Sequence, residues 1–505
     1  MQLCAPKCGS LYAALALLFG ALLLTTGCGD SARPGTPPKH LVLITVDTLR
    51  ADHLSSWLYG RPTSYAPSTD EERALGHALA IDDLAEGGVM FRNAYTPRGQ
   101  TTPAVASLMT GRSPLEHSVL QNGNVLPADA ATLAEHFQGA GFVTAGFTSN
   151  ALLVPPSGLA QGFDVFQSYK GADRDLEVVS GAMKWLSSLD REDGPPIFLW
   201  LHFMGPHLPY DPLPMSGADV DFANMFTDPD YTGEANGSRE FLDDAYLNHK
   251  PLDGLDVHEV VAKYDGEIAR INFIVRKFLQ LYAGVYEQPR ANRMNETALV
   301  FAADHGEELH ERFGYWAHSK SVYSSVLHVP LILHHPGSLT GRRVVDELVT
   351  LEDVAPTLLD WFQIAPKSNM TGRSLLPLVD TYEEFEFESR PAFGGWRDSI
   401  FTVRAVVDGR HFRLVWNPEN IVPDEKPPGD YTIPELALYE VTNDPNEKRD
   451  MARAYPSVVV ELKAAIVDWL STQDRAGAAA NSAELSGALE ELGYTDSTKT
   501  EEGSE

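Results

Sequence analysis

The chain has 505 residues, of which 43% are hydrophobic and 22% are charged, and this composition is typical of a globular protein. Its formal net charge of −31 at pH 7 repels nucleic-acid phosphates, so we expect no nucleic-acid partner. The only cysteines are Cys4, Cys8 and Cys28, all near the N-terminus. The rest of the chain therefore has neither a disulfide nor a thiol nucleophile.

The N-terminal segment has the pattern of an export signal. Residues 11–24 form an apolar run that is too short for a comfortable membrane span, and Thr25-Thr26-Gly27-Cys28 follows it. This pattern resembles a bacterial lipoprotein signal, and the alternative is a plain signal peptide that is cut nearby. We expect residues 1–28 to be the signal, Cys28 to be lipidated after cleavage, and residues 29–39 to be a Pro-rich linker. The protein would then be exported and membrane-anchored, in the periplasm or at the outer membrane.

Strand and helix patterns alternate from residue 40 onward. Near-continuous apolar runs predict buried strands, and amphipathic stretches predict helices between them. Alternation of this kind indicates an α/β fold, a sheet flanked by helices. The predicted strands are 40–46, 142–147, 197–202, 298–303 and 330–333, and the predicted helices are 78–84, 131–137, 176–186 and 257–281.

The pattern changes after about residue 385. Residues 402–416 are typical of two strands around Asp408-Gly409, a strong hairpin signal, and residues 458–470 are typical of a helix. We expect a catalytic domain over 40–385 and a smaller α+β subdomain over 386–475. Residues 476–505 are acidic and are expected to be partly disordered.

Acidic residues follow two of the predicted strands. Asp47 comes after the first, and Asp304-His305 comes after the strand 298–303. Ligands of open α/β sheets gather at the carboxyl ends of strands, and carboxylates beside an imidazole suit a divalent cation. An Asp after a strand is also a common turn or cap residue. Further histidines lie near strand ends or in loops, namely His202, His207 and His318.

A loop and helix start form the next motif, TPRGQTTPAVASLMTGR over residues 96–112. Thr101 and Thr102 precede a proline that can open the helix, so either threonine could be a nucleophile or a helix cap.

These motifs, in this order, resemble the sulfatase family of the alkaline phosphatase superfamily. The resemblance rests on VDTLRADHL, TTPAVASLMTGR, TLAEHFQGAGFVTAGF, HFMGPHLPYDP, ADHGEELHE and AHSKSVYSSVLHVPLILHHPG, and it covers nearly all of the chain after the signal. It implies an α/β fold with a large mixed, mostly parallel sheet flanked by helices and a smaller C-terminal α+β subdomain. It also aligns Pro103, and this places Thr101 at the nucleophile position and leaves Thr102 as the helix N-cap.

The sequence departs from a typical sulfatase at this position. The family has a Cys or Ser that is oxidised to formylglycine, and Thr101 cannot be the source of that aldehyde. Val105 replaces the family's Arg, and Thr48 replaces a second aspartate. The remaining residues resemble the site of threonine-nucleophile phosphotransferases such as lipoteichoic acid synthases. That resemblance implies one divalent ion, Ca, Mn, Mg or Zn, held by Asp47, Thr101, Asp304 and His305.

The resemblance also suggests roles for the other polar residues. His207 and His318 would hold substrate oxygens or protonate the leaving group, and Lys320 and His202 would bind substrate. We expect a metal-dependent hydrolase or transferase of sulfate, phosphate or phosphonate esters that acts on an anionic ester substrate. The alternative is a catalytically inactive, sulfatase-like binding lipoprotein of the cell surface. A structural or adhesive protein receives little support because no repeat is present. The sequence does not predict an oligomeric state.

Overall fold

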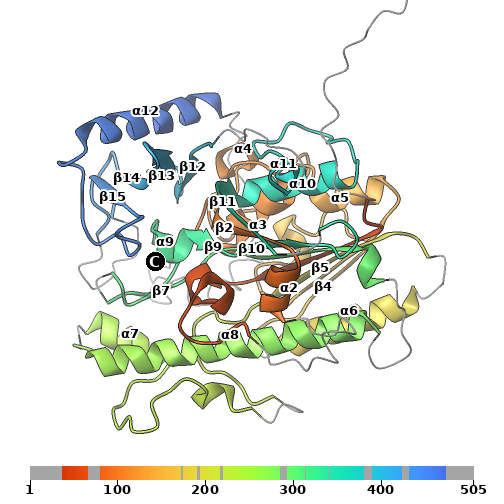
Figure 1. Cartoon of the computed structure of the whole chain (residues 1–505), viewed down its shortest axis with the longest axis horizontal. Helices are drawn as coiled ribbons and strands as arrows, with labels where there is room; N and C mark the ends of the chain where they lie inside the picture. The colour runs from red at the N-terminus through yellow and green to blue at the C-terminus, as the bar shows by residue number, and fades with distance from the viewer. Residues whose placement is uncertain are drawn as a thin grey trace, which may run out of the picture. The chain divides into compact units, whose positions relative to one another are not determined.

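A mixed sheet of nine strands forms the centre of the fold (Figure 1). The structure is a computed structural model that describes residues 37–65, 80–171, 174–189, 194–215, 220–248, 250–284, 293–312, 314–339, 342–379, 389–422 and 432–473. Along the sheet the order is β11-β2-β10-β6-β1-β5-β3-β4, and β9 pairs with β2. The strands are β1 (His40–Val46), β2 (Val89–Tyr95), β3 (Val143–Thr148), β4 (Val165–Ser168), β5 (Ile197–Phe203), β6 (Thr297–Ala303), β9 (His328–Val329), β10 (Leu331–His334) and β11 (Arg343–Thr350).

Most neighbours in this sheet are parallel, and β10 is antiparallel to both β2 and β6. The predicted mixed, mostly parallel sheet is therefore confirmed. All seven residues of β1, β5 and β6 are buried, because these strands lie in the middle of the sheet with both faces covered. Because both faces of these strands are buried, their sequences are almost continuously apolar, as in HLVLITV of β1.

Helices pack on the sheet in two groups. One group joins α2 and α6 to the long helix α8, and the other joins α3, α5 and α10 (Figure 1). The helices are α2 (Ile81–Gly87), α3 (Thr101–Thr110), α4 (Pro114–His117), α5 (Leu133–Gly139), α6 (Asp175–Ser188), α7 (Arg239–Leu247), α8 (Gly254–Tyr282), α9 (Ser324–Leu327), α10 (Val354–Trp361) and α11 (Leu376–Val379). Each of the four predicted helices before residue 300 is present, with ends shifted by a few residues. Among the described residues, no helix is long and apolar enough to cross a bilayer.

Two strands near the sheet edge, β2 and β11, are absent from the sequence predictions. Both contain exposed charged residues, Arg92 in β2 and Asp346 in β11, so neither gives the continuous apolar run of a central strand. The two side chains form an ion pair across the parallel strands. An edge strand needs only one buried face, and the apolar-run criterion therefore misses it.

Helix α3 begins two residues earlier than expected, since an N-cap at Thr102 would make Pro103 the first helical residue. Thr101 is its first residue and Gln100 is the N-cap, without a side-chain capping bond. The expectation that Thr102 caps the helix is therefore wrong. The Thr102 backbone N–H instead donates to Asn122 Oδ1 at 2.9 Å, so a side chain from outside the helix satisfies this free N–H group. The helix ends at Gly111, whose φ of 65° is the left-handed conformation that favours glycine.

A second, four-stranded antiparallel sheet lies in the C-terminal region, with helix α12 (Pro456–Thr472) packed on it. Asp408 and Gly409 have φ values of 49° and 73°, so the predicted hairpin forms around a two-residue turn. The predicted hairpin and helix are confirmed. The predicted boundaries at residues 385/386 and 475/476 lie outside the described residues. The strands are β12 (Ala392–Trp396), β13 (Ile400–Val407), β14 (Arg410–Trp416) and β15 (Leu436–Glu440), and a separate short pair is β7 (Glu308–Leu309) with β8 (Trp316–Ala317).

Candidate metal and nucleophile site

Three neighbouring strands place two carboxylates and an imidazole at one point of the sheet. Strand β1 lies between β6 and β5, with Val46 opposite Ala303 and Thr45 opposite His202. Asp47 and Asp304, each one residue past its strand, therefore lie side by side at the carboxyl ends of β1 and β6. His202 approaches them from β5. The strand-end position that the sequence predicts for the site is thus produced by the strand register.

The polar atoms of these three residues fit a divalent cation. One atom each from Asp47, His202 and Asp304 lies within 4.8 Å of the others, and all three side chains are completely buried. Within the described part of the chain, Asp47 Oδ1, Asp304 Oδ2 and His202 Nε2 have no hydrogen-bond partner. Buried polar atoms without partners are costly, and carboxylate oxygens with an imidazole nitrogen are a suitable donor set for a cation.

His305 and Thr101 complete the cluster. His305 Nε2 lies 3.5 Å from Asp47 Oδ1 and 3.7 Å from Asp304 Oδ2. Its Nδ1 lies 3.0 Å from the Gly306 carbonyl oxygen, which can only accept, so Nδ1 carries the proton and the Nε2 lone pair faces the cluster. Thr101 Oγ1 lies 3.4 Å from both His305 Nε2 and Asp47 Oδ2. The structure therefore brings together the four residues that the sequence assigns to the metal, and their role as ligands stays a prediction.

Thr101 also occupies the N-terminus of helix α3, a helix of ten residues. The positive end of the helix dipole favours negative charge within the first turn. An alkoxide at Thr101 Oγ1 is therefore stabilised by the helix.

The two carboxyl groups have opposite pKa shifts. Although burial alone raises it, the pKa of Asp47 is lowered below its usual range by the neighbouring imidazoles of His202 and His305. Burial, together with the charge of Asp47, raises the pKa of Asp304 well above its usual range. The pocket thus tolerates one negative charge readily, and a second one needs a cation.

Asn150 is a site residue that the sequence analysis missed. Its side-chain amide donates to Asp47 Oδ2 at 2.5 Å, and both residues are buried. Strand β3 runs beside β5, with Thr148 opposite His202, so Asn150 lies two residues past its strand end. The strand-end rule that finds Asp47 could therefore also have found Asn150.

A row of buried histidines extends from the cluster. The His318 ring centroid lies 4.4 Å from that of His305 and 5.1 Å from that of His207. His318 Nδ1 lies 3.1 Å from Glu307 Oε1, so Glu307, to which the sequence analysis gave no role, orients this ring. Burial raises the pKa of Glu307 to about 7, and burial with the adjacent His305 lowers the pKa of His318 well below its usual range.

The remaining predicted residues occupy less informative positions. Lys320 is half-buried and lies two residues past His318, and its role in substrate binding stays a prediction. Cys28 lies outside the described residues. The sequence analysis assigns His202 to substrate binding. In the structure, however, His202 lies among the candidate metal ligands, with its Nε2 3.8 Å from Asp47 Oδ2.

Two of the substituted positions have a structural explanation. Thr48 has a φ of 55°, and its backbone N–H, rather than its side chain, contacts Asp304 Oδ1 at 3.3 Å. Val105, four residues after Thr101 on α3, belongs to the hydrophobic core. Neither side chain supplies the charge that the family's residue would supply.

Comparisons with known proteins identify the family and the fold. The family model described as Sulfatase matches residues 39–364. The chain is 22% identical over 484 residues to the Delta 4,5-hexuronate-2-O-sulfatase of Bacteroides thetaiotaomicron, covering 88% of this chain and 91% of that protein. It is 24% identical over 353 residues to the extracellular sulfatase SULF-1 homolog of Drosophila melanogaster, covering 63% of this chain and 30% of that protein. The solved phosphonate monoester hydrolase of Agrobacterium radiobacter superimposes with a TM-score of 0.62 at 18% identity, over 86% of this chain and 96% of that one.

Proposed function

The chain belongs to the sulfatase family and is a hydrolase of its sulfuric and phosphoric ester class, and from that premise we propose that Thr101 is the nucleophile and that one divalent cation assists it. The proposed substrate is an anionic sulfate, phosphate or phosphonate ester. Two of these three ester types are represented among the similar proteins, sulfate by the hexuronate sulfatase and phosphonate by the phosphonate monoester hydrolase.

The observation that carries the proposal is the position of Thr101 Oγ1. It lies 3.4 Å from Asp47 Oδ2 and 3.4 Å from His305 Nε2, at the N-terminus of α3. The Asp47 carboxylate can accept the hydroxyl proton, the single free lone pair of His305 is left for the cation, and the helix dipole stabilises the resulting alkoxide. A typical sulfatase activates a formylglycine hydrate instead, and this chain has no residue for that chemistry at position 101.

The cation would be held by Asp47, Asp304, His305 and His202, and it would supply positive charge to the nucleophile and to the ester oxygens. Thr101 Oγ1 attacks the sulfur or phosphorus and forms a covalent ester, while the bond to the leaving alcohol breaks. In this proposal His318 and His207 donate the proton that the leaving oxygen needs, which is supported by the proximity of the two rings and by the contact of Glu307 with His318. Water then hydrolyses the Thr101 ester and restores the hydroxyl.

A pair of adjacent threonines provides the test. The purified protein with MnCl₂ is assayed on 4-nitrophenyl sulfate, bis(4-nitrophenyl) phosphate and 4-nitrophenyl phenylphosphonate. Thr101→Ala removes the nucleophile, and we expect a loss of activity on the order of 10³-fold or more. Thr101→Ser keeps the hydroxyl and is expected to retain measurable turnover. Thr102→Ala is the matched control, since Thr102 is also buried but its hydroxyl has no hydrogen-bond partner among the described residues.

Two outcomes would count against this function. Undiminished turnover in Thr101→Ala would remove the assigned nucleophile. A protein that binds a divalent ion and an anionic ester but hydrolyses none of the three substrates would instead be the sulfatase-like binding lipoprotein.

The membrane attachment is a separate proposal that rests on the sequence alone. We propose that the protein is exported and anchored through a lipid on Cys28. Expression in a bacterial host with radiolabelled palmitate should label the chain and place it in the membrane fraction, and Cys28→Ala should abolish both. Labelling that persists in Cys28→Ala would disprove the anchor.

A further inference from the structure

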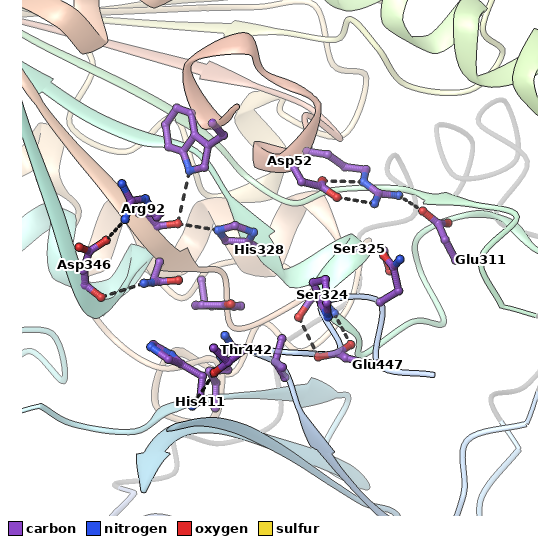
Figure 2. A pocket seen from close by; sticks show the side chains of 18 of the residues that line it. Asp52, Arg92, Glu311, Ser324, Ser325, His328, Asp346, His411, Thr442 and Glu447 are labelled. Atoms are coloured by element: carbon purple, nitrogen blue, oxygen red, sulfur yellow. Dashed lines mark hydrogen bonds and ion pairs between the residues drawn. The ribbon is translucent and has the colours of Figure 1, made fainter. Parts of the chain in front are cut away.

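A cavity of about 440 Å³ lies where the edge of the main sheet meets the C-terminal sheet (Figure 2). Arg92 and Tyr95 of β2 line it from one side, and Arg404 of β13 and His411 of β14 line it from the other. Exposed side chains, among them Arg92 and Thr442, form part of its wall, so the cavity is open to solvent. This volume suits a small organic ligand.

Arg404 is a buried cation without an ion-pair partner among the described residues. Its side chain is only 4% exposed, and its Nε and Nη1 atoms have no hydrogen-bond partner in the part of the chain that the structure describes. Its nearest described favourable contact is the Tyr95 ring, whose centroid lies 5.3 Å from the guanidinium carbon. Stacking of this kind orients a guanidinium but leaves its N–H donors free.

The hairpin register makes this arrangement costly. Arg404 and Arg413 lie directly opposite each other on β13 and β14, and like charges at opposed positions destabilise a sheet. Arg413 is compensated, since its Nε donates to Glu447 Oε1 at 2.6 Å. Glu447 also accepts from the Ser324 hydroxyl at 2.7 Å, as Figure 2 shows. Glu447 also pairs with Arg312 of the cavity lining, at 3.7 Å between Nη2 and Oε2, whereas Arg404 has no ion pair within the described ranges.

The other charged groups around the cavity are already paired. Arg50 binds Asp52 and Glu311, and Arg92 binds Asp346 (Figure 2). His411 adds a polar atom that has no partner within the described chain, its buried Nδ1. The cavity therefore presents one uncompensated positive charge with free donors, and an anion is the ligand that completes it.

We propose that this cavity is a second anion-binding site, in which the Arg404 guanidinium receives the carboxylate, sulfate or phosphate group of a small ligand. A planar guanidinium binds such oxyanions with two parallel hydrogen bonds, so Arg404 gives the site both charge and geometry. The site is distinct from the Asp47 cluster, and it does not depend on which ester the protein hydrolyses.

Two arginine variants test the proposal. Binding of sodium sulfate, sodium phosphate and sodium glucuronate to the purified protein is measured by calorimetry, and unfolding is followed in each salt and in sodium chloride of equal ionic strength. Arg404→Gln removes the guanidinium, and Arg453→Gln is the control, because Arg453 is exposed and does not line the cavity. Binding at the Asp47 cluster is common to both variants, so the difference between them isolates the cavity.

We expect Arg404→Gln to bind at least one of the three anions about tenfold or more weakly than Arg453→Gln does. We also expect it to unfold at a higher temperature than the wild type in chloride, since an uncompensated buried charge has been removed. The anion with the largest loss identifies the oxyanion group. Equal affinity of the two variants for all three anions would overturn the proposal.

A second variant keeps the test decisive if Arg404→Gln does not fold. Arg404→Lys retains the charge and the aliphatic stem but loses the paired donors. In a folded Arg404→Lys protein, unchanged affinity for all three anions would equally overturn the proposal, and weakened binding would support it.

Discussion

The candidate metal site should affect stability in two ways: its two carboxylates repel each other, and a bound cation stabilises the fold. Replacing Asp304 by asparagine should separate these two effects. The interacting atoms of Asp47 and Asp304 lie within 4.8 Å of each other. At an effective dielectric constant of about 20, two unit charges at that distance repel by about 3 kcal/mol. The asparagine side chain keeps an oxygen that can accept from the Thr48 and His305 backbone N–H groups, so Asp304→Asn removes the charge with little change of shape.

The assay is thermal unfolding in a chelator and then with MnCl₂, MgCl₂, CaCl₂ or ZnCl₂. In the chelator, Asp304→Asn should unfold at a higher temperature than the wild type, because the repulsion is gone. A cation at about 100 times its Kd should stabilise the wild type by about 2.7 kcal/mol, and the variant by much less. Asp468→Asn, on the exposed side of α12, is the control and should behave as the wild type. An equal gain from the metal in Asp304→Asn and wild type would refute the assignment of Asp304 as a ligand.

Two further predictions concern buried polar groups behind the cluster. Burial raises the pKa of Glu267 to about 8, so between about pH 4.5 and pH 8 the folded state binds more protons than the unfolded state, and stability falls as the pH rises through this window. Each pH unit of this window lowers the free energy of unfolding by at most about 1.4 kcal/mol. Glu267→Gln should therefore exceed the wild type in free energy of unfolding by up to a few kcal/mol at about pH 9 and by much less at about pH 5. Chemical denaturation at the two pH values measures this difference, and an equal gain at both would contradict the prediction. Asn150→Leu removes the amide that donates to Asp47 and should reduce metal affinity or kcat by about 10- to 100-fold. Metal titration and steady-state kinetics measure these two quantities, and no change in either would contradict the prediction.

The sequence contains enough information to predict the centre of this fold and part of the site. Strands β1, β5 and β6 are buried on both faces, so each appears as a continuous apolar run. Asp47 and Asp304 could be predicted as neighbours because parallel strands end at the same edge of a sheet. Helix α3 could be predicted from its loop and proline, although it begins at Thr101, two residues before the predicted start.

The rest depends on contacts between distant segments. The strand-end rule could nominate Asn150, but its contact with Asp47 depends on the register between β3 and β5, which the local sequence does not specify. Strand β2, next to the edge strand β11, is interrupted by the exposed Arg92 and lacks a continuous apolar run. The opposition of Arg404 and Arg413 follows from the two-residue turn at Asp408, and it can be derived from the sequence. That Glu447 reaches Arg413 and leaves Arg404 without an ion pair among the described residues depends on the tertiary structure.

The candidate metal site and the cavity share one physical principle. Each holds a buried charge that the rest of the described chain does not neutralise, a second carboxylate in one case and Arg404 in the other. A fold with no use for these charges would gain stability from neutral residues of the same size, because buried ionic groups rarely outweigh their desolvation cost. The metal site is explained by the chemistry of the family, since its charge would hold a cation beside Thr101. Because the same cost is present at Arg404 without an ion pair to balance it, the cavity calls for the same kind of explanation, a ligand of opposite charge.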